Sequence, residues 1–219
     1  MDHDEVVAVV RAGYDRIADG FLAAVQSRRA PDPRDEWVPK LLARLPERAR
    51  ILDAGCGAGV PTARDLVEGG HEVVGVDVSP RQIELARAHV PGATFMVGDL
   101  SRVELGTAAF DGIVALYSLT HVPRGEYPQL FARFTTALRP GGCFLGAVGR
   151  SDSDGFEERD FLGFVGTDGW TNSHDRDTML AIVGAAGLTV VEHALVDEAT
   201  PFGPERWLWI LAVAGGPSA

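Results

Sequence analysis

A short glycine-rich loop between an apolar run and a helix-like segment constrains the fold of this chain more than any other feature. Residues 51–60 read ILDAGCGAGV, so that Gly55, Gly57 and Gly59 follow a strand-like run that contains Asp53. Glycine at a strand-to-helix turn lets the backbone approach a ligand closely. The sequence therefore predicts a ligand-binding turn after the first strand of an α/β sheet.

Strand-like and helix-like segments alternate on both sides of this loop as far as residue 150. Such alternation predicts parallel strands joined by right-handed crossovers. After a further helix that ends at Gly187, two apolar runs follow each other with no helix between them, which predicts an antiparallel hairpin at one sheet edge. We expect a Rossmann-like, doubly wound sheet of seven strands that is mostly parallel, with an antiparallel C-terminal hairpin. The predicted strands are residues 50–55, 72–77, 94–99, 112–118, 143–149, 189–196 and 205–215.

The length of 219 residues fits a single domain. Two helices precede the first strand, and the first of them is predicted to break at Gly13, because glycine disfavours a helix interior. One long segment before the last helix lacks a regular pattern, and long irregular insertions tend to be lids or substrate loops. The expected parts are N-terminal helices (1–49), a ligand-binding core (50–150), a lid or substrate insert (151–174), and a C-terminal helix and hairpin (175–219).

The spacing of the glycines argues against two phosphate-binding motifs. A P-loop requires Gly-Lys-Ser/Thr, whereas Val60 and Pro61 follow Gly59. A dinucleotide fingerprint would place its third glycine at the position of Val60. The pattern Asp-x-Gly-x-Gly-x-Gly at the end of a first strand instead resembles the class I methyltransferases that use S-adenosylmethionine.

Three further segments match that family, and the resemblance covers about residues 10–150. In the family, an acid that ends the second strand, here Asp77, takes both ribose hydroxyls, and an acid that ends the third strand, here Asp99, faces the adenine amino group. A tyrosine of an N-terminal motif, here Tyr14, reaches the methionine carboxylate. The resemblance implies S-adenosylmethionine as the cofactor and S-adenosylhomocysteine as the product, and Asp53 would favour its cationic groups. The implied cofactor-binding residues are Tyr14, Asp53, Gly55, Cys56, Gly57, Asp77, Val78, Gly98, Asp99, Leu100 and Leu116.

Two histidines and two aromatic residues are candidates for the substrate side. His121 follows the fourth predicted strand, where a neutral imidazole would be able to remove a proton from a nucleophile; a histidine that only orients the turn is the alternative. His174 is a candidate second base, or else a polar residue at a helix start. Tyr117 and Trp170 are candidate aromatic walls for a flat or cationic substrate, with core packing as the alternative for Tyr117.

Charge and composition bear on the partners. Residues 151–219 hold twelve acidic and three basic side chains, and such a surface repels phosphate backbones, so we expect no nucleic-acid partner. The longest apolar run, WLWILAVA, is too short to cross a bilayer, and the acidic N-terminus shows no secretory signal. Two cysteines, Cys56 and Cys143, predict neither a disulfide framework nor a metal site. We expect a cytoplasmic monomer or homodimer that acts on a small molecule without contact to a membrane.

These features predict methyl transfer to a hydroxyl, amine or carbon nucleophile of a small molecule, of the kind found in secondary metabolism. Three alternatives stay open at this point. A family member can hold the cofactor and catalyse a non-methylating reaction such as a cyclisation. A non-catalytic binding module can keep the pocket without turnover. A nicotinamide-dependent oxidoreductase is disfavoured by Val60 and by the absence of an obvious hydride-transfer pair.

Overall fold

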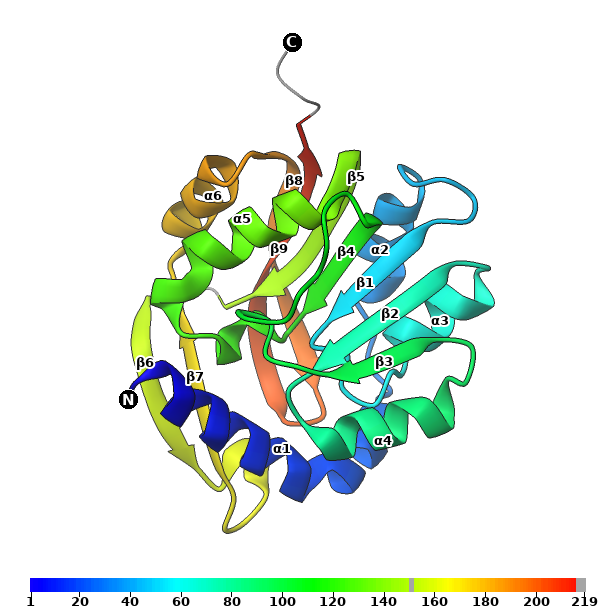
Figure 1. Ribbon diagram of the computed structural model, residues 1–219. Coiled ribbons are helices and arrows are strands. Elements are labelled where there is room, and N and C mark those ends of the chain that lie inside the picture. The colour runs from blue at the N-terminus through cyan, green and yellow to red at the C-terminus, as the bar shows by residue number, and fades with distance from the viewer. Residues whose placement is uncertain (150–151, 216–219) are drawn as a thin grey trace.

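A seven-stranded sheet forms the centre of the computed structural model, which describes residues 1–149 and 152–215 (Figure 1). Its strand order is β3-β2-β1-β4-β5-β9-β8. Strands β1 to β5 are parallel, and β9 runs antiparallel to both β5 and β8. The predicted fold class is therefore confirmed. The strands are β1 (Arg50–Ala54), β2 (Glu72–Asp77), β3 (Thr94–Val97), β4 (Phe110–Leu116), β5 (Leu138–Val148), β8 (Leu188–Thr200) and β9 (Gly203–Ala214).

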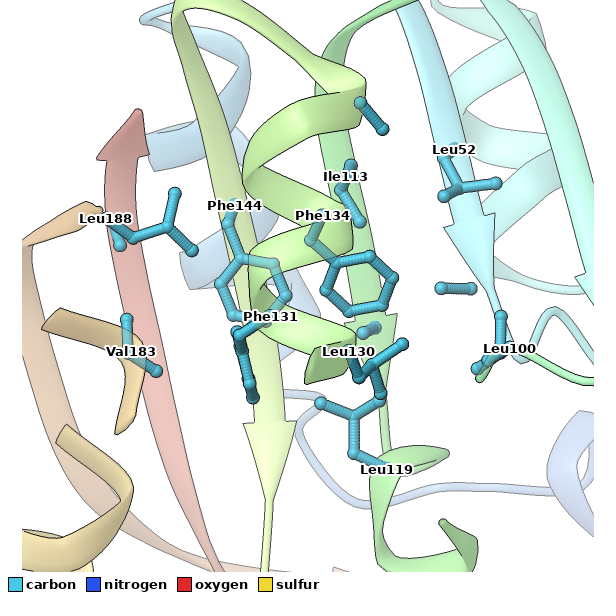
Figure 2. Packing of buried hydrophobic residues seen from close by; sticks show 14 of the residues in the cluster. Leu52, Leu100, Ile113, Leu119, Leu130, Phe131, Phe134, Phe144, Val183 and Leu188 are labelled. Atoms are coloured by element: carbon cyan, nitrogen blue, oxygen red, sulfur yellow. The ribbon is translucent and has the colours of Figure 1, made fainter. Parts of the chain in front are cut away.

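Helices cover both faces of the sheet. Helices α2 (Arg34–Leu42), α3 (Thr62–Glu68) and α4 (Pro80–His89) bury their apolar sides on one face, and α5 (Tyr127–Ala137) and α6 (Arg176–Ala185) on the other. Apolar residues three and four positions apart in α5 produce its buried side. Figure 2 shows Phe131 and Phe134 of that helix against Phe144 of β5, with ring centroids 5.3 and 5.9 Å from the Phe144 ring. These contacts pack α5 against β5.

Helix α1 (His3–Gln26) is continuous, so the predicted break at Gly13 is wrong. A Cβ atom at Gly13 would lie 2.5 Å from the carbonyl oxygen of Asp168, on a neighbouring strand. The glycine therefore serves close packing rather than helix termination. Asp2 and Glu5 form a capping box at the start of the helix. No helix among residues 1–149 and 152–215 is long and apolar enough to span a membrane.

Gly13→Ala is expected to destabilise the protein by about 1–3 kcal/mol, because the added methyl group overpacks this contact. Gly184 of α6 is a matched control, since it is also helical and a Cβ there would meet nothing within 4 Å. Gly184→Ala should stabilise by about 0.5–1 kcal/mol through helix propensity alone. Denaturant unfolding of both variants measures the difference, and equal stabilisation by both would contradict the packing role of Gly13.

Residues 153–173 form an antiparallel two-stranded ribbon rather than the irregular segment that we predicted. Strand β6 (Ser153–Arg159) is largely exposed, whereas β7 (Asp168–Ser173) packs against α1 (Figure 1). Only one strand of the ribbon is well buried, and the sequence therefore lacks the alternation of apolar residues that marks most strands. Between them lies the short helix η3 (Phe161–Gly163). The ribbon and α1 together form one side of the site.

Candidate active site

A cavity of about 840 Å³ opens at the carboxyl ends of β1, β2 and β4. Ligands of open α/β sheets bind at this edge. Helix α1, the β6–β7 ribbon and the β8–β9 hairpin supply the other walls. All the expected cofactor-binding residues line this cavity, together with Tyr117 and His121: Tyr14, Asp53, Gly55, Cys56, Gly57, Asp77, Val78, Gly98, Asp99, Leu100 and Leu116.

The glycine loop takes a conformation that other residues rarely adopt. Gly55 has φ +81° and Gly57 has φ +51°. A Cβ atom at Gly55 would lie 2.1 Å from the Cβ of Ser118, which follows β4. At Gly57 a Cβ atom would make only an ordinary contact, 3.8 Å from Gln82 Oε1, so the positive φ alone favours glycine there. The loop is therefore closely packed against the end of β4 and leaves room on its cavity side.

Asp77 at the end of β2 is held by the backbone around it. Its Oδ2 accepts the Gly57 N–H and its Oδ1 accepts the Ser79 N–H, each at 2.9 Å. Burial raises the pKa of the Asp77 carboxyl to about 6, against the opposing effect of these two bonds. Each oxygen keeps a lone pair that can accept a further hydrogen bond. The carboxylate is thus fixed in place for bidentate recognition of a diol.

Asp53 at the end of β1 is an acid without a hydrogen-bond partner on one oxygen. The residue is 3% exposed, and its Oδ2 makes no hydrogen bond to residues 1–149 or 152–215. Burial, followed by the nearby negative charge of Asp77, raises the pKa of Asp53 to about 7, and Arg34 acts in the opposite direction. A buried carboxylate of this kind is stabilised by a cation. Its environment fits the cationic groups of S-adenosylmethionine.

Gln82 of α4 is a site residue that the sequence analysis missed. It lines the cavity, it is 1% exposed, and neither its Oε1 nor its Nε2 has a hydrogen-bond partner in the part of the chain that the structure describes. Glutamine in an amphipathic helix normally lies on the surface, so no local sequence pattern pointed to it. A buried amide without partners costs free energy unless a ligand or water satisfies it. Gln82 therefore indicates a polar ligand beside the glycine loop.

Tyr14 and His121 form a hydrogen-bonded pair in the cavity. The Nδ1–H of His121 donates to the carbonyl oxygen of Trp170 at 2.8 Å, because a carbonyl can only accept. His121 Nε2 is then the acceptor of the Tyr14 hydroxyl, at 2.9 Å. Burial lowers the pKa of His121 to about 4 and raises the pKa of Tyr14 well above its usual range. Both side chains are therefore uncharged at neutral pH.

Another part of the cavity holds a polar cluster from three separate parts of the chain. Tyr117, which has φ +64°, donates its hydroxyl to both oxygens of Glu198 at 3.0 Å. Arg28 lies 3.6 Å from the same carboxylate, and Arg34 pairs with Asp32. Glu198, Arg28 and Arg34 line the cavity. The sequence analysis missed all three, because the loop after α1 and the β8–β9 hairpin meet only in the fold.

Two predicted site residues lie outside the cavity lining. Trp170 packs against Val6 and Val10 of α1 and serves the site only through its carbonyl oxygen. His174 is buried with its Nε2 at 3.3 Å from the Arg124 carbonyl oxygen and its ring against Tyr127. The side chains of both residues thus pack against neighbouring residues outside the cavity lining. We therefore withdraw His174 as a catalytic base and Trp170 as a substrate wall.

Comparison with known protein families agrees with this geometry. Residues 51–142 match a family model described as a methyltransferase domain. Methyltransferase GfsG of Streptomyces halstedii is 30% identical over 188 residues, which is 79% of this chain and 67% of that protein. The ubiquinone biosynthesis O-methyltransferase of Methylocella silvestris is 37% identical over 121 residues, 53% of this chain and 44% of that protein. This chain thus spans two thirds of the first relative and less than half of the second.

Solved structures share the fold over nearly the whole chain. The 1,6-didemethyltoxoflavin-N1-methyltransferase of Burkholderia thailandensis, solved with 1,6-didemethyltoxoflavin and S-adenosylhomocysteine, is 26% identical with a TM-score of 0.66, covering 98% of this chain and 91% of that one. The [4+2]-cyclase SpnF is 17% identical with a TM-score of 0.71, covering 95% of this chain and 98% of that one. The second likeness concerns the fold alone.

Proposed function

Since this chain belongs to the class I S-adenosylmethionine-dependent methyltransferases, we propose that it methylates a hydroxyl, amine or carbon nucleophile of a small molecule. The observation that carries this proposal is the Tyr14–His121 pair, which shares one cavity with Asp53, Asp77 and Asp99. Relatives named for methyl transfer to small molecules support it. The bound cofactor supplies an electrophilic methyl group on a sulfonium.

The residues that we assign to the cofactor follow from their charge and position. Asp77 takes the ribose hydroxyls, Asp99 faces the adenine, and Asp53 balances the cationic groups. We assign the methionine carboxylate to Arg34 instead of Tyr14, whose hydroxyl already binds His121. Arg34 binds Asp32 through Nε and Nη2, while no hydrogen bond within residues 1–149 and 152–215 involves its Nη1. That nitrogen suits a ligand carboxylate.

The Tyr14–His121 pair gives the nucleophile a path for its proton. The Tyr14 oxygen accepts the proton of the substrate hydroxyl or amine, while the Tyr14 proton moves to His121 Nε2. The imidazole becomes cationic, its Nδ1–H remains on the Trp170 carbonyl, and the tyrosine regains its hydroxyl. The nucleophile gains the methyl group as it loses this proton. Charge and atoms therefore balance without a free tyrosinate.

The substrate half of the cavity has aromatic walls from separate elements. Phe21 of α1 stacks on Phe202 of the β8–β9 hairpin, with ring centroids 5.3 Å apart and planes within 5°. Phe161 meets Tyr14 edge to face at 5.5 Å, and Trp207 also lines the cavity. Such walls favour a flat aromatic body. We therefore propose an aromatic acceptor with an O–H or N–H group close to Tyr14.

A screen of acceptors tests this function. The protein is incubated with S-adenosylmethionine and matched panels of phenols, aromatic N–H heterocycles, aliphatic alcohols and aliphatic amines. We expect S-adenosylhomocysteine to form, and a product with one added methyl group, only with aromatic acceptors. Tyr14→Phe should reduce this turnover while cofactor binding persists. Methylation confined to aliphatic acceptors would refute the substrate class, and cofactor binding without methylation of any acceptor would favour the cyclase or the non-catalytic role.

The affinity for S-adenosylhomocysteine is expected to fall as the pH drops from about 8 to about 5. Because the carboxyl pKa values of Asp53 and Asp77 are raised to about 7 and about 6, both groups take up protons in this range. A protonated carboxyl loses its attraction for the ammonium group and one of its acceptor positions. Calorimetric titration measures the effect, and Asp53→Asn should remove its part near pH 7. A pH-independent affinity of the unmodified protein would contradict these assignments.

A further inference from the structure

The first turn of α1 reaches the adenine end of the cavity through His3. The His3 Nε2–H donates to Asp99 Oδ2 at 2.6 Å, and the two side chains are 13% and 18% exposed. His3 Nδ1 lies 3.6 Å from Glu126 Oε1 and is buried without a hydrogen-bond partner. Glu126 belongs to the short helix η2 (Arg124–Glu126). His3 thus lies between Asp99 and Glu126, which belong to different segments, and is hydrogen-bonded to Asp99.

Both oxygens of Asp99 already carry a donor in this structure. Oδ1 accepts the Ser101 N–H at 2.9 Å, and Oδ2 accepts from His3. His3 itself lines the cavity, so its imidazole lies on the side from which a ligand approaches. Oδ2 keeps a second lone pair, but the imidazole lies on its cavity side, so an adenine amino group that donates to Oδ2 from the cavity competes with His3 for the space beside this oxygen. Glu126 Oε1, 3.6 Å from His3 Nδ1, can accept from the imidazole once its proton lies on Nδ1.

The position of His3 couples this competition to the helix that covers the site. Helix α1 also carries Tyr14. Near its start, Asp4 pairs with Arg102 at 2.8 Å, but both side chains are more than half exposed, so this ion pair holds the turn weakly. The contact between His3 and Asp99 is the more buried of the two. The His3–Asp99 hydrogen bond is therefore the main contact that holds the first turn of α1 to the segment after β3.

We propose that His3 is a latch at the adenine end of the site, which competes with the cofactor for Asp99. Cofactor binding exchanges the His3–Asp99 bond for a bond between adenine and Asp99, and His3 moves toward Glu126. Because the His3–Asp99 bond and the adenine–Asp99 bond exclude each other, the latch weakens binding of both S-adenosylmethionine and S-adenosylhomocysteine. It thereby favours release of the product after each turnover. This inference rests on the proposed role of Asp99 and is independent of the acceptor substrate.

His3→Ala tests the latch with two readouts that move in opposite directions. We expect calorimetry to show about tenfold tighter binding of S-adenosylhomocysteine, since the competing donor is gone. We also expect the melting temperature of the empty protein to fall. His3→Gln keeps a side-chain N–H that can donate to Asp99, so its affinity should stay closer to that of the unmodified protein. Unchanged or weaker binding by His3→Ala would overturn the proposal, because a residue that only forms the cavity wall has this effect.

Asp99→Ala separates failure of the latch from failure of the cofactor assignment. If Asp99 holds the adenine, this variant binds S-adenosylhomocysteine more weakly, and adding His3→Ala to it changes the affinity no further. Weaker binding by Asp99→Ala without tighter binding by His3→Ala would overturn the latch alone. Unchanged affinity of Asp99→Ala would remove Asp99 from the adenine site and overturn the latch with it.

Discussion

His121→Ala is expected to lower turnover by about 10²–10⁴-fold while cofactor affinity stays within about threefold of the unmodified protein. His121 Nε2 is the acceptor for the Tyr14 hydroxyl, so the variant lacks the nitrogen that receives the proton in the proposed path. The residue lies in the short helix η1 (Leu119–His121) after β4, away from the acids assigned to the cofactor. Steady-state turnover with a methylated acceptor and calorimetry with S-adenosylhomocysteine measure the two effects.

His174→Ala is the matched control for this variant. His174 is buried and His121 is half-buried, and each bonds to a backbone carbonyl, but only His121 lines the cavity. We expect His174→Ala to lose stability and keep its turnover per folded molecule. Parallel losses in both variants would show that His121 supports the loop instead of the reaction. A fully active and stable His121→Ala protein would leave alignment of the reactants alone to explain the rate.

The pH profile separates the base from the cofactor acids. An unperturbed imidazole would give an acid limb near pH about 6.5, as the sequence alone predicts. Burial lowers the pKa of His121 to about 4, so turnover at saturating cofactor should persist well below that limb. Protonation of Asp53 and Asp77 instead raises the amount of cofactor needed for saturation. A limb near 6.5 in the saturated rate would contradict the buried, neutral state of His121.

The parts of the site that follow the strand order were predictable from sequence. Asp53, Asp77 and Asp99 come directly after or at the ends of the first three strands, and parallel strands bring such ends to one edge of a sheet. The glycine loop was recognisable from its residue types, because few residues other than glycine tolerate the positive φ at Gly55. Local patterns thus determine both the sheet and one wall of the cavity.

The contacts between distant segments could not be predicted in the same way. Tyr14 and His121 are bonded across 107 positions, and His3 and Asp99 across 96. The resemblance implied that Tyr14 binds the methionine carboxylate. In the fold Tyr14 bonds to His121 instead, because α1 packs on the η1 segment. Gln82 has the sequence environment of a surface helix. Such roles depend on tertiary packing, which no local pattern records.

Asp77→Ala is expected to weaken binding of S-adenosylhomocysteine by about 10²–10⁴-fold. The proposed bonds to two ribose hydroxyls are charge-assisted, and each contributes about 1.5–3 kcal/mol. The variant also strips the acceptor from the N–H groups of Gly57 and Ser79. The glycine loop then loses a bond that fixes its position, so part of the loss comes from a less ordered site. Calorimetric titration gives the affinity directly.

Asp111→Asn is the control for a buried acid in the same sheet. Asp111 accepts the Arg50 N–H and pairs with Arg139, near the start of β4 and away from the cavity lining. Its loss should lower the melting temperature and leave cofactor affinity unchanged. Asp77→Asn keeps one carbonyl acceptor without the negative charge, so its affinity should lie between those of Asp77→Ala and the unmodified protein. Equal affinities of the unmodified protein, Asp77→Ala and Asp77→Asn for S-adenosylhomocysteine would show that this acid does not hold the ribose of S-adenosylmethionine. Tight binding of NAD instead of S-adenosylhomocysteine would show the same.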